Sequence, residues 1–193
     1  MSRSILKAAV FLFTFVSVFI LGNSAHGDKQ SSSLQSIFEI SDDWKDDQNQ
    51  TVRLSQFKDK HIVITMSYTS CKKICPQLTN TKLQEVEKYY QTTKTPAEFI
   101  IVSFDPENDT PKILAEYRKA HGFTSGHWHF LTGNLEATKS LARKLGLGGF
   151  FQMESHIVHD FKIVLLEPNG KSAEINWDQR DVSAVVKSLK LAP

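Results

Sequence analysis

The chain has 193 residues, of which 40% are hydrophobic and 10% aromatic, so one folded domain with a real core is expected and a disordered chain is excluded. Arg3 and Lys7 are the only charged residues among the first 25, and without them 21 basic residues face 21 acidic ones. A neutral domain lacks the basic surface that nucleic-acid binding requires, so no nucleic-acid partner is predicted.

The N-terminal segment has the layout of a secretory signal peptide. Arg3 and Lys7 precede an apolar run over residues 8–21, and small and polar residues follow at 22–25. We predict that residues 1–25 are a signal peptide, or an uncleaved membrane anchor, since the run approaches the ~17-residue minimum for a membrane span. Either way the domain is expected outside the cytoplasm, in the periplasm, and touches the membrane only through this segment.

Residues 26–35 are polar and predict a linker, and residues 36–193 are predicted to form the domain. Alternation at 37–40 and at 51–54 predicts two short strands joined by a turn. Further strands are predicted at 61–67, 98–104, 127–131, 161–166 and 171–177, and helices at 76–90, 111–121, 135–145 and 182–189.

Local signals place the ends of these elements. Thr110 before Pro111 predicts an N-cap followed by the first helical residue, and Asn134 predicts a second N-cap. The residues at 168–170, Pro-Asn-Gly, predict a hairpin turn, and the glycine-rich stretch 146–155 predicts a loop. Alternating strands and helices predict an α/β sandwich of thioredoxin type with a mixed central sheet, an N-terminal β-hairpin, and a C-terminal hairpin plus helix.

Cys71 and Cys75 are the only cysteines, and they lie where a predicted strand gives way to a helix. The partial positive charge of a helix N-terminus favours the thiolate form. A structural disulfide is one interpretation, although closing so short a loop would stabilise the fold by only about 2 kcal/mol. Two buried, inert thiols are disfavoured because Lys72 and Lys73 lie between them. Redox or metal chemistry is the favoured interpretation, since exported thiols meet oxidants.

A Cys-x-x-x-Cys pair needs a further group, and His159 is the candidate because it follows the glycine-rich loop at the start of a predicted strand. Two thiolates and one imidazole form a soft set that suits copper, whereas structural zinc would take a fourth protein ligand. His159 could equally be a surface or partnered core histidine. The same alternative holds for His127, His129 and His156, and Met153 could add a thioether ligand or fill an apolar gap.

Five motifs together resemble the Sco/SenC family in their order and spacing, over roughly residues 36–190. They are the residues at 50–54, 68–76, 103–111 and 131–133, and His159 placed eleven residues before Gly170.

The resemblance implies a thioredoxin-like domain outside a membrane that supports assembly of the dinuclear copper centre of cytochrome c oxidase. It implies that Cys71, Cys75 and His159 bind one copper, or that the two cysteines reduce a partner's disulfide, with Asp105 in the loop beside them. The implied partner is the oxidase subunit that carries this centre, and other copper chaperones or thiol-disulfide proteins are further candidates.

Two departures from the family pattern affect the predicted site. Lys72 and Lys73 stand where the family often has Pro-Asp, and Val158 stands where Asp is common. Added positive charge weakens the case for holding a copper cation and, by favouring thiolate, strengthens the case for disulfide exchange. Asp160 is a candidate to compensate. The sequence therefore predicts an exported copper chaperone, with a periplasmic thiol-disulfide oxidoreductase or an interaction module with a structural disulfide as alternatives.

Overall fold

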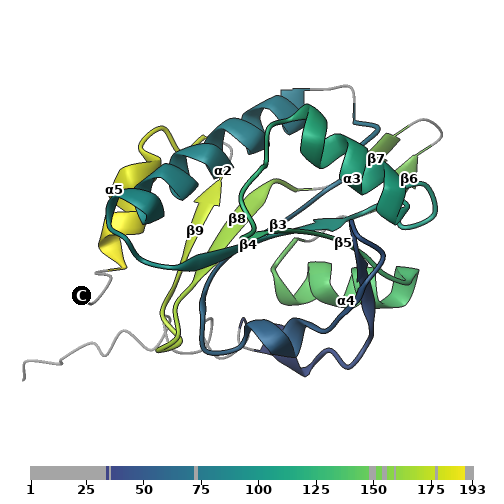
Figure 1. Cartoon of the computed structure of the whole chain (residues 1–193), viewed down its shortest axis with the longest axis horizontal. Helices are drawn as coiled ribbons and strands as arrows, with labels where there is room; N and C mark the ends of the chain where they lie inside the picture. The colour runs from purple at the N-terminus through teal and green to yellow at the C-terminus, as the bar shows by residue number, and fades with distance from the viewer. Residues whose placement is uncertain are drawn as a thin grey trace, which may run out of the picture.

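The computed structural model describes residues 34, 36–71, 74–147, 151–153, 156–158, 160–176 and 178–189. Within these residues, seven strands form one mixed sheet in the order β2-β1-β5-β4-β3-β8-β9 (Figure 1). The strands are β1 (Trp44–Asp46), β2 (Thr51–Val52), β3 (His61–Ser67), β4 (Ala97–Ser103), β5 (Trp128–Thr132), β8 (Lys162–Leu166) and β9 (Ser172–Asn176).

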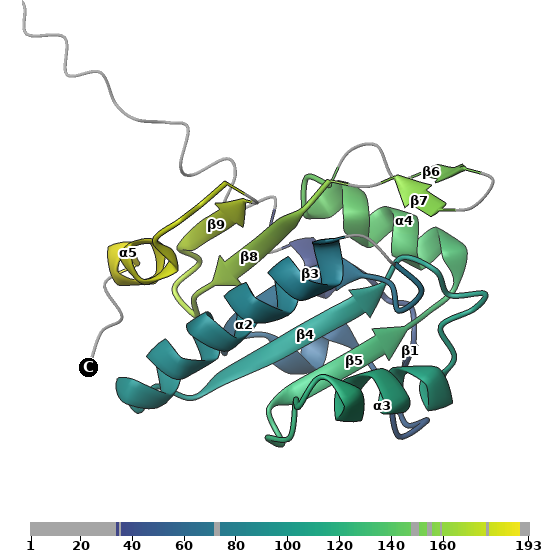
Figure 2. The ribbon, with the colours of Figure 1, turned by 90° about the horizontal axis from the view of Figure 1, so that it is seen from above.

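The middle of the sheet is parallel and its flanks are antiparallel. β3 pairs with β4 and β4 with β5 in parallel, and Figure 2 shows β4 and β5 running in the same direction. β8 pairs antiparallel with β3, β9 with β8, and β1 with both β5 and β2. The carboxyl ends of the three parallel strands therefore meet at one edge of the sheet, where α/β proteins commonly place their functional groups.

Helices cover both faces of the sheet (Figures 1 and 2). On one face lie α2 (Ile74–Thr92), α3 (Pro111–Ala120) and α5 (Val182–Ser188). On the other lie α4 (Leu135–Lys144) and two 3-10 helices, η1 (Ser36–Glu39) and η2 (Leu54–Phe57).

Successive residues of the central strands contribute to two separate cores, as strand geometry requires. Ile62 and Ile64 of β3 belong to the core under α4, whereas Val63 belongs to the core under α2. This burial on both faces explains why β3 and β4 read as continuous apolar runs.

The helix starts predicted at Thr110 and Asn134 are confirmed, whereas the helix predicted from residue 76 begins at Ile74. The Thr110 hydroxyl accepts a hydrogen bond from the Ile113 N–H with Pro111 at the first helical position of α3, and the Asn134 side chain accepts one from the Ala137 N–H at 2.8 Å at the start of α4. The predicted α/β sandwich with its mixed sheet, N-terminal hairpin and C-terminal hairpin plus helix is also confirmed.

The strand predicted at 37–40 is wrong. Those residues form η1 and its end, and the hairpin is built instead from β1 and β2. Ile37 and Ile40 are both buried. Their spacing of three residues matches one turn of a 3-10 helix as well as it matches a short strand. Leu54, predicted to end the second strand, begins η2.

The loop predicted over 146–155 is wrong in its second half. Phe151–Met153 forms β6, which pairs antiparallel with β7 (His156–Val158) as a separate two-stranded sheet. This hairpin lies at the same end of the molecule as the start of α2 in both views (Figures 1 and 2).

Among the described helices, none combines the length and the apolar composition that crossing a membrane requires. The predicted signal peptide or anchor over 1–25 lies outside the described residues.

Candidate functional site

The segment that joins β3 to α2 carries Cys71, so the strand-to-helix junction predicted around the cysteines is confirmed. Cys71 is a free, half-buried thiol that packs against the core under α4. Cys75 lies in the first turn of α2, and its side chain is outside the described part of the chain. Cys71 is therefore closed on its inner side by apolar residues and remains partly open to solvent.

Asp109 connects the cysteine segment to the next strand. Asp109 is 1% exposed, and its carboxylate accepts hydrogen bonds from the Thr69 N–H at 3.1 Å, the Thr69 hydroxyl at 2.5 Å and the Ser103 hydroxyl at 2.5 Å. Burial raises the pKa of Asp109 above its ordinary value, although the hydrogen bonds from Ser103 and Thr69 oppose this shift. The ends of β3 and β4 are thus tied together through one buried side chain.

Asp105 lies in the same loop as Asp109. Its carboxylate accepts hydrogen bonds at 2.9 and 3.0 Å from the side-chain amide of Asn108. Among the described contacts, the carboxylate that reaches the cysteine segment is that of Asp109, which was not singled out from the sequence. Its place directly before the N-cap residue Thr110, after a central strand, is the signal that could have drawn attention to it.

A tyrosine from α3 stands close to the same segment. The Tyr117 hydroxyl is 3.2 Å from the side-chain amide of Asn80 on α2. Burial raises the pKa of Tyr117, and the nearby Cys71 and Asp109 act in the same direction, while the Asn80 hydrogen bond opposes them. A cavity of about 10 Å³ between Thr69, Asp109 and Tyr117 has room for roughly one water molecule.

The β6–β7 hairpin also meets the cysteine segment. The Tyr68 hydroxyl donates a hydrogen bond of 3.4 Å to the carbonyl oxygen of Ile157, and both residues are buried in the core under α4. Ile157 is two residues before His159, which lies outside the described residues. Within the described residues, no group of three or more His, Cys, Asp or Glu side chains is arranged to hold a metal ion. Only one of the three predicted ligands, Cys71, has a described side chain.

The other histidines raised as candidates lie elsewhere or are not fully described. His129 Nε2 is 2.8 Å from Glu98, which makes it a partnered histidine of the sheet. His127 lines a cavity, and His156 is in β7 with a side chain outside the described part, as is that of Met153.

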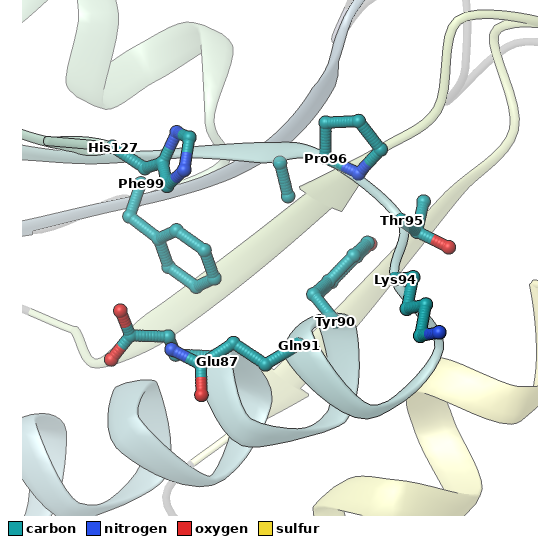
Figure 3. A pocket seen from close by; sticks show the side chains of 9 residues that line it. Glu87, Tyr90, Gln91, Lys94, Thr95, Pro96, Phe99 and His127 are labelled. Carbon is teal, nitrogen blue, oxygen red and sulfur yellow. The ribbon is translucent and has the colours of Figure 1, made fainter. Parts of the chain in front are cut away.

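That cavity, of about 190 Å³, opens at the far end of α2 (Figure 3). The rings of Tyr90 and Phe99 line it together with Glu87 and His127. From Ile74 to Tyr90, α2 extends about 24 Å, so this cavity is remote from Cys71.

The sequence matches the family described as SCO1/SenC over residues 28–192. The chain is 26% identical to a SCO1 protein homolog of Bacillus subtilis over 129 residues, which are 62% of this chain and 63% of that protein. It is 30% identical to a SCO2-like protein of Rickettsia typhi over 119 residues, which are 56% of this chain and 55% of that one. The matched region thus spans less than two thirds of the length of these relatives.

The fold is similar to several solved structures. Arabidopsis thaliana ScoI with copper bound gives a TM-score of 0.64 at 23% identity, covering 76% of this chain and 92% of that one. Yeast Sco1 with copper bound gives 0.62 at 17% identity, covering 79% and 88%. BsSco, described as a member of the Sco family of cytochrome c oxidase assembly proteins with a disulfide switch, gives 0.66 at 23% identity, covering 77% and 88%.

These identities are low enough that the structural likeness concerns the fold, and it confirms the predicted thioredoxin-like sandwich. The match of the sequence to the family, in contrast, identifies the family itself, because it extends over residues 28–192, well over half of the chain. The chain belongs to the SCO1/SenC family.

Proposed function

We propose that this chain is an exported copper chaperone that binds one copper ion through Cys71, Cys75 and His159 and supports assembly of the dinuclear copper centre of cytochrome c oxidase. The observation that carries the proposal is the free Cys71 thiol in the segment before α2. The same segment contains Tyr68, whose hydroxyl donates a hydrogen bond to the carbonyl of Ile157. Because Ile157 is two residues before His159, that contact supports the proposal that this part of the chain lies close to the cysteine segment.

The chemistry of the donor set fits copper as cargo. Thiolates and imidazole are soft or borderline ligands that copper prefers over oxygen donors. A half-buried thiol suits cargo, because an ion can enter and leave from the open side. Two family members of similar fold are known with copper bound, which supports the same role here.

The proposed partner is the oxidase subunit that carries the dinuclear copper centre, with other copper chaperones or thiol-disulfide proteins as further partners. BsSco is described as belonging to a family of cytochrome c oxidase assembly proteins, which supports this assignment. Residues 1–25 support a place outside the cytoplasm, because they have the layout of a signal peptide or an anchor.

Anaerobic copper titration of the reduced, purified chain tests the proposal. We expect one tightly bound copper ion per chain, lost in Cys71→Ser and in Cys75→Ser. His159→Ala should weaken binding by more than the roughly 10- to 100-fold that loss of an outer-shell partner costs. His127→Ala is the matched control and should bind like the wild type, since His127 lies at the remote cavity. Copper binding that survives in Cys75→Ser would contradict the chaperone proposal.

Disulfide reduction is the second candidate, favoured by Lys72 and Lys73 between the cysteines, whose positive charge stabilises thiolate. In that reaction Cys71 and Cys75 form a disulfide, and their two electrons and two protons reduce the disulfide of the partner. His159→Ala separates the two functions. Oxidase assembly in cells that survives this variant favours reduction, whereas assembly that fails while both thiols remain reactive favours copper delivery.

A further inference from the structure

Asp109 is the one buried carboxylate among the described residues that bonds directly to the cysteine segment. Resting on the proposed function, we propose that Asp109 is a positioning residue: by hydrogen bonding to Thr69 it sets the place of the Cys71 thiol relative to α2, and so the geometry in which that thiol meets copper or a partner's disulfide. The carboxylate itself need not touch the cargo.

The Asp109 carboxylate is held in place by its own loop. The Asp109 N–H donates to the carbonyl of Asp105 at 2.8 Å, and the Asp105 N–H donates to the Ser103 hydroxyl at 2.9 Å. That hydroxyl in turn donates to Asp109 Oδ2. Because Ser103 ends β4, the acceptor is anchored to the central sheet and not to a surface loop alone.

On the cysteine side, Thr69 is bonded through both its backbone and its side chain. Two donors from one residue fix both the position and the orientation of Thr69, two residues before Cys71. The neighbouring strand ends are also joined, since the Phe104 N–H donates to the carbonyl of Ser67 at 2.9 Å. What remains between this anchored region and α2 is a short connection that starts at Ser70.

A second link holds α2 to the same framework. Thr110, which follows Asp109, is the N-cap of α3, and Tyr117 of α3 is hydrogen-bonded to Asn80 of α2. Cys71 therefore lies between two connections that start from one loop: Asp109 to Thr69 before it, and Tyr117 to Asn80 after it.

Asp109→Ala and Asp109→Asn, made in the full chain, separate the hydrogen bonds from the charge. Asparagine can keep the three short contacts, because its carbonyl oxygen can accept from the Thr69 N–H and the Ser103 hydroxyl while its amide donates to the Thr69 hydroxyl oxygen. Alanine keeps none of them. Glu167→Ala is the matched control, since Glu167 is 3% exposed and accepts a hydrogen bond of 3.1 Å from Tyr90 at the other end of the sheet.

Two measurements are made on each variant. The first is copper affinity together with the sulfur-to-copper charge-transfer spectrum. The second needs no metal: the rate at which iodoacetamide alkylates Cys71 in chains that also carry Cys75→Ser. If the wild type binds no copper, the proposed function fails, but the alkylation rates still decide the role of Asp109.

We expect Asp109→Ala to lower copper affinity about 10- to 100-fold, to shift the charge-transfer band and to change the alkylation rate several-fold. Asp109→Asn should behave like the wild type. Glu167→Ala should lower the melting temperature and leave both measurements unchanged. The proposal is overturned if Asp109→Ala matches the wild type, if asparagine is as damaging as alanine, or if Glu167→Ala produces the same changes.

If Asp109→Ala does not fold, Thr69→Val provides a second test of the proposal. It removes the hydroxyl donor and leaves the N–H and the carboxylate, so a smaller change of alkylation rate is expected. A Cys71 that reacts at the wild-type rate in this variant would equally overturn the proposal.

Discussion

Glu98, on β4, is a half-buried carboxylate shared between two basic side chains. Its oxygens are 2.9 Å from Lys60 Nζ and 2.8 Å from His129 Nε2. Burial alone would raise the pKa of Glu98, but the hydrogen bonds from Lys60 and His129 outweigh it and hold the pKa below its ordinary value of 4.5. Protonating Glu98 therefore costs the folded protein more than the unfolded chain.

This direction predicts how stability depends on pH. A carboxyl whose folded pKa is lowered contributes stability that is complete above its unfolded pKa and is lost as the pH falls through its folded pKa. Glu98→Gln should cost roughly 1 kcal/mol at neutral pH, and its difference from the wild type should shrink below about pH 4.5.

Urea unfolding of both proteins between about pH 7 and pH 3 makes this comparison. Glu136→Gln is the control, because the exposed pair of Glu136 and Lys139 should contribute little. A difference for Glu98→Gln that stays constant over this range would contradict the assignment.

At the scale of elements, β1 pairs with β5, and the position directly after β5 can be occupied only by a glycine, Gly133. Lys45 of β1 pairs with Thr132 of β5, and the ring of Trp44, which is completely buried, passes over Gly133. A Cβ atom on Gly133 would be 2.5 Å from Trp44 Cε3, closer than such atoms can approach. The absence of a side chain at Gly133 thus allows the N-terminal hairpin to join the sheet.

Gly133→Ala should therefore destabilise the fold by about 1–3 kcal/mol, since a rigid buried ring must move. Gly126→Ala is the matched control, because a Cβ there meets no atom within 4 Å. Thermal unfolding of the two variants beside the wild type gives the answer. Equal melting temperatures for both variants would mean that Trp44 has room to shift.

At the scale of the whole molecule, the described residues form one sheet between two helical layers, with Cys71 at the edge where the parallel strands end. Residues 1–25 have the layout of a signal peptide or a membrane anchor. We predict export directed by this segment.

Mass measurement of the purified protein after cell fractionation tests export. A chain that starts near His26 in the soluble periplasmic fraction indicates cleavage, and an intact chain in the membrane fraction indicates an anchor. A variant without residues 2–25 should stay in the cytoplasm. The prediction is refuted if the full-length chain, like the variant without residues 2–25, stays in the cytoplasm.

Sequence alone was sufficient for the elements with strong local signals, although the local alternation at 37–40 did not specify a strand. The β-branched run at 61–67 is β3, and Thr110 with Pro111 and Asn134 start the helices that they were predicted to start. Capping and periodicity act between residues a few positions apart, so they can be read without the rest of the chain. The spacing of Cys71 and Cys75 at a strand-to-helix junction is a signal of the same kind.

The tertiary structure decided what depends on distant partners. β1 forms a local hairpin with β2, but its place in the main sheet depends on pairing with β5, more than 80 positions away. Thr69 meets Asp109 across 40 positions, and Tyr68 meets Ile157 across 89. No pattern within one segment specifies which buried donor will find which acceptor, because that choice is made only when the strands assemble and exclude water from the groups between them.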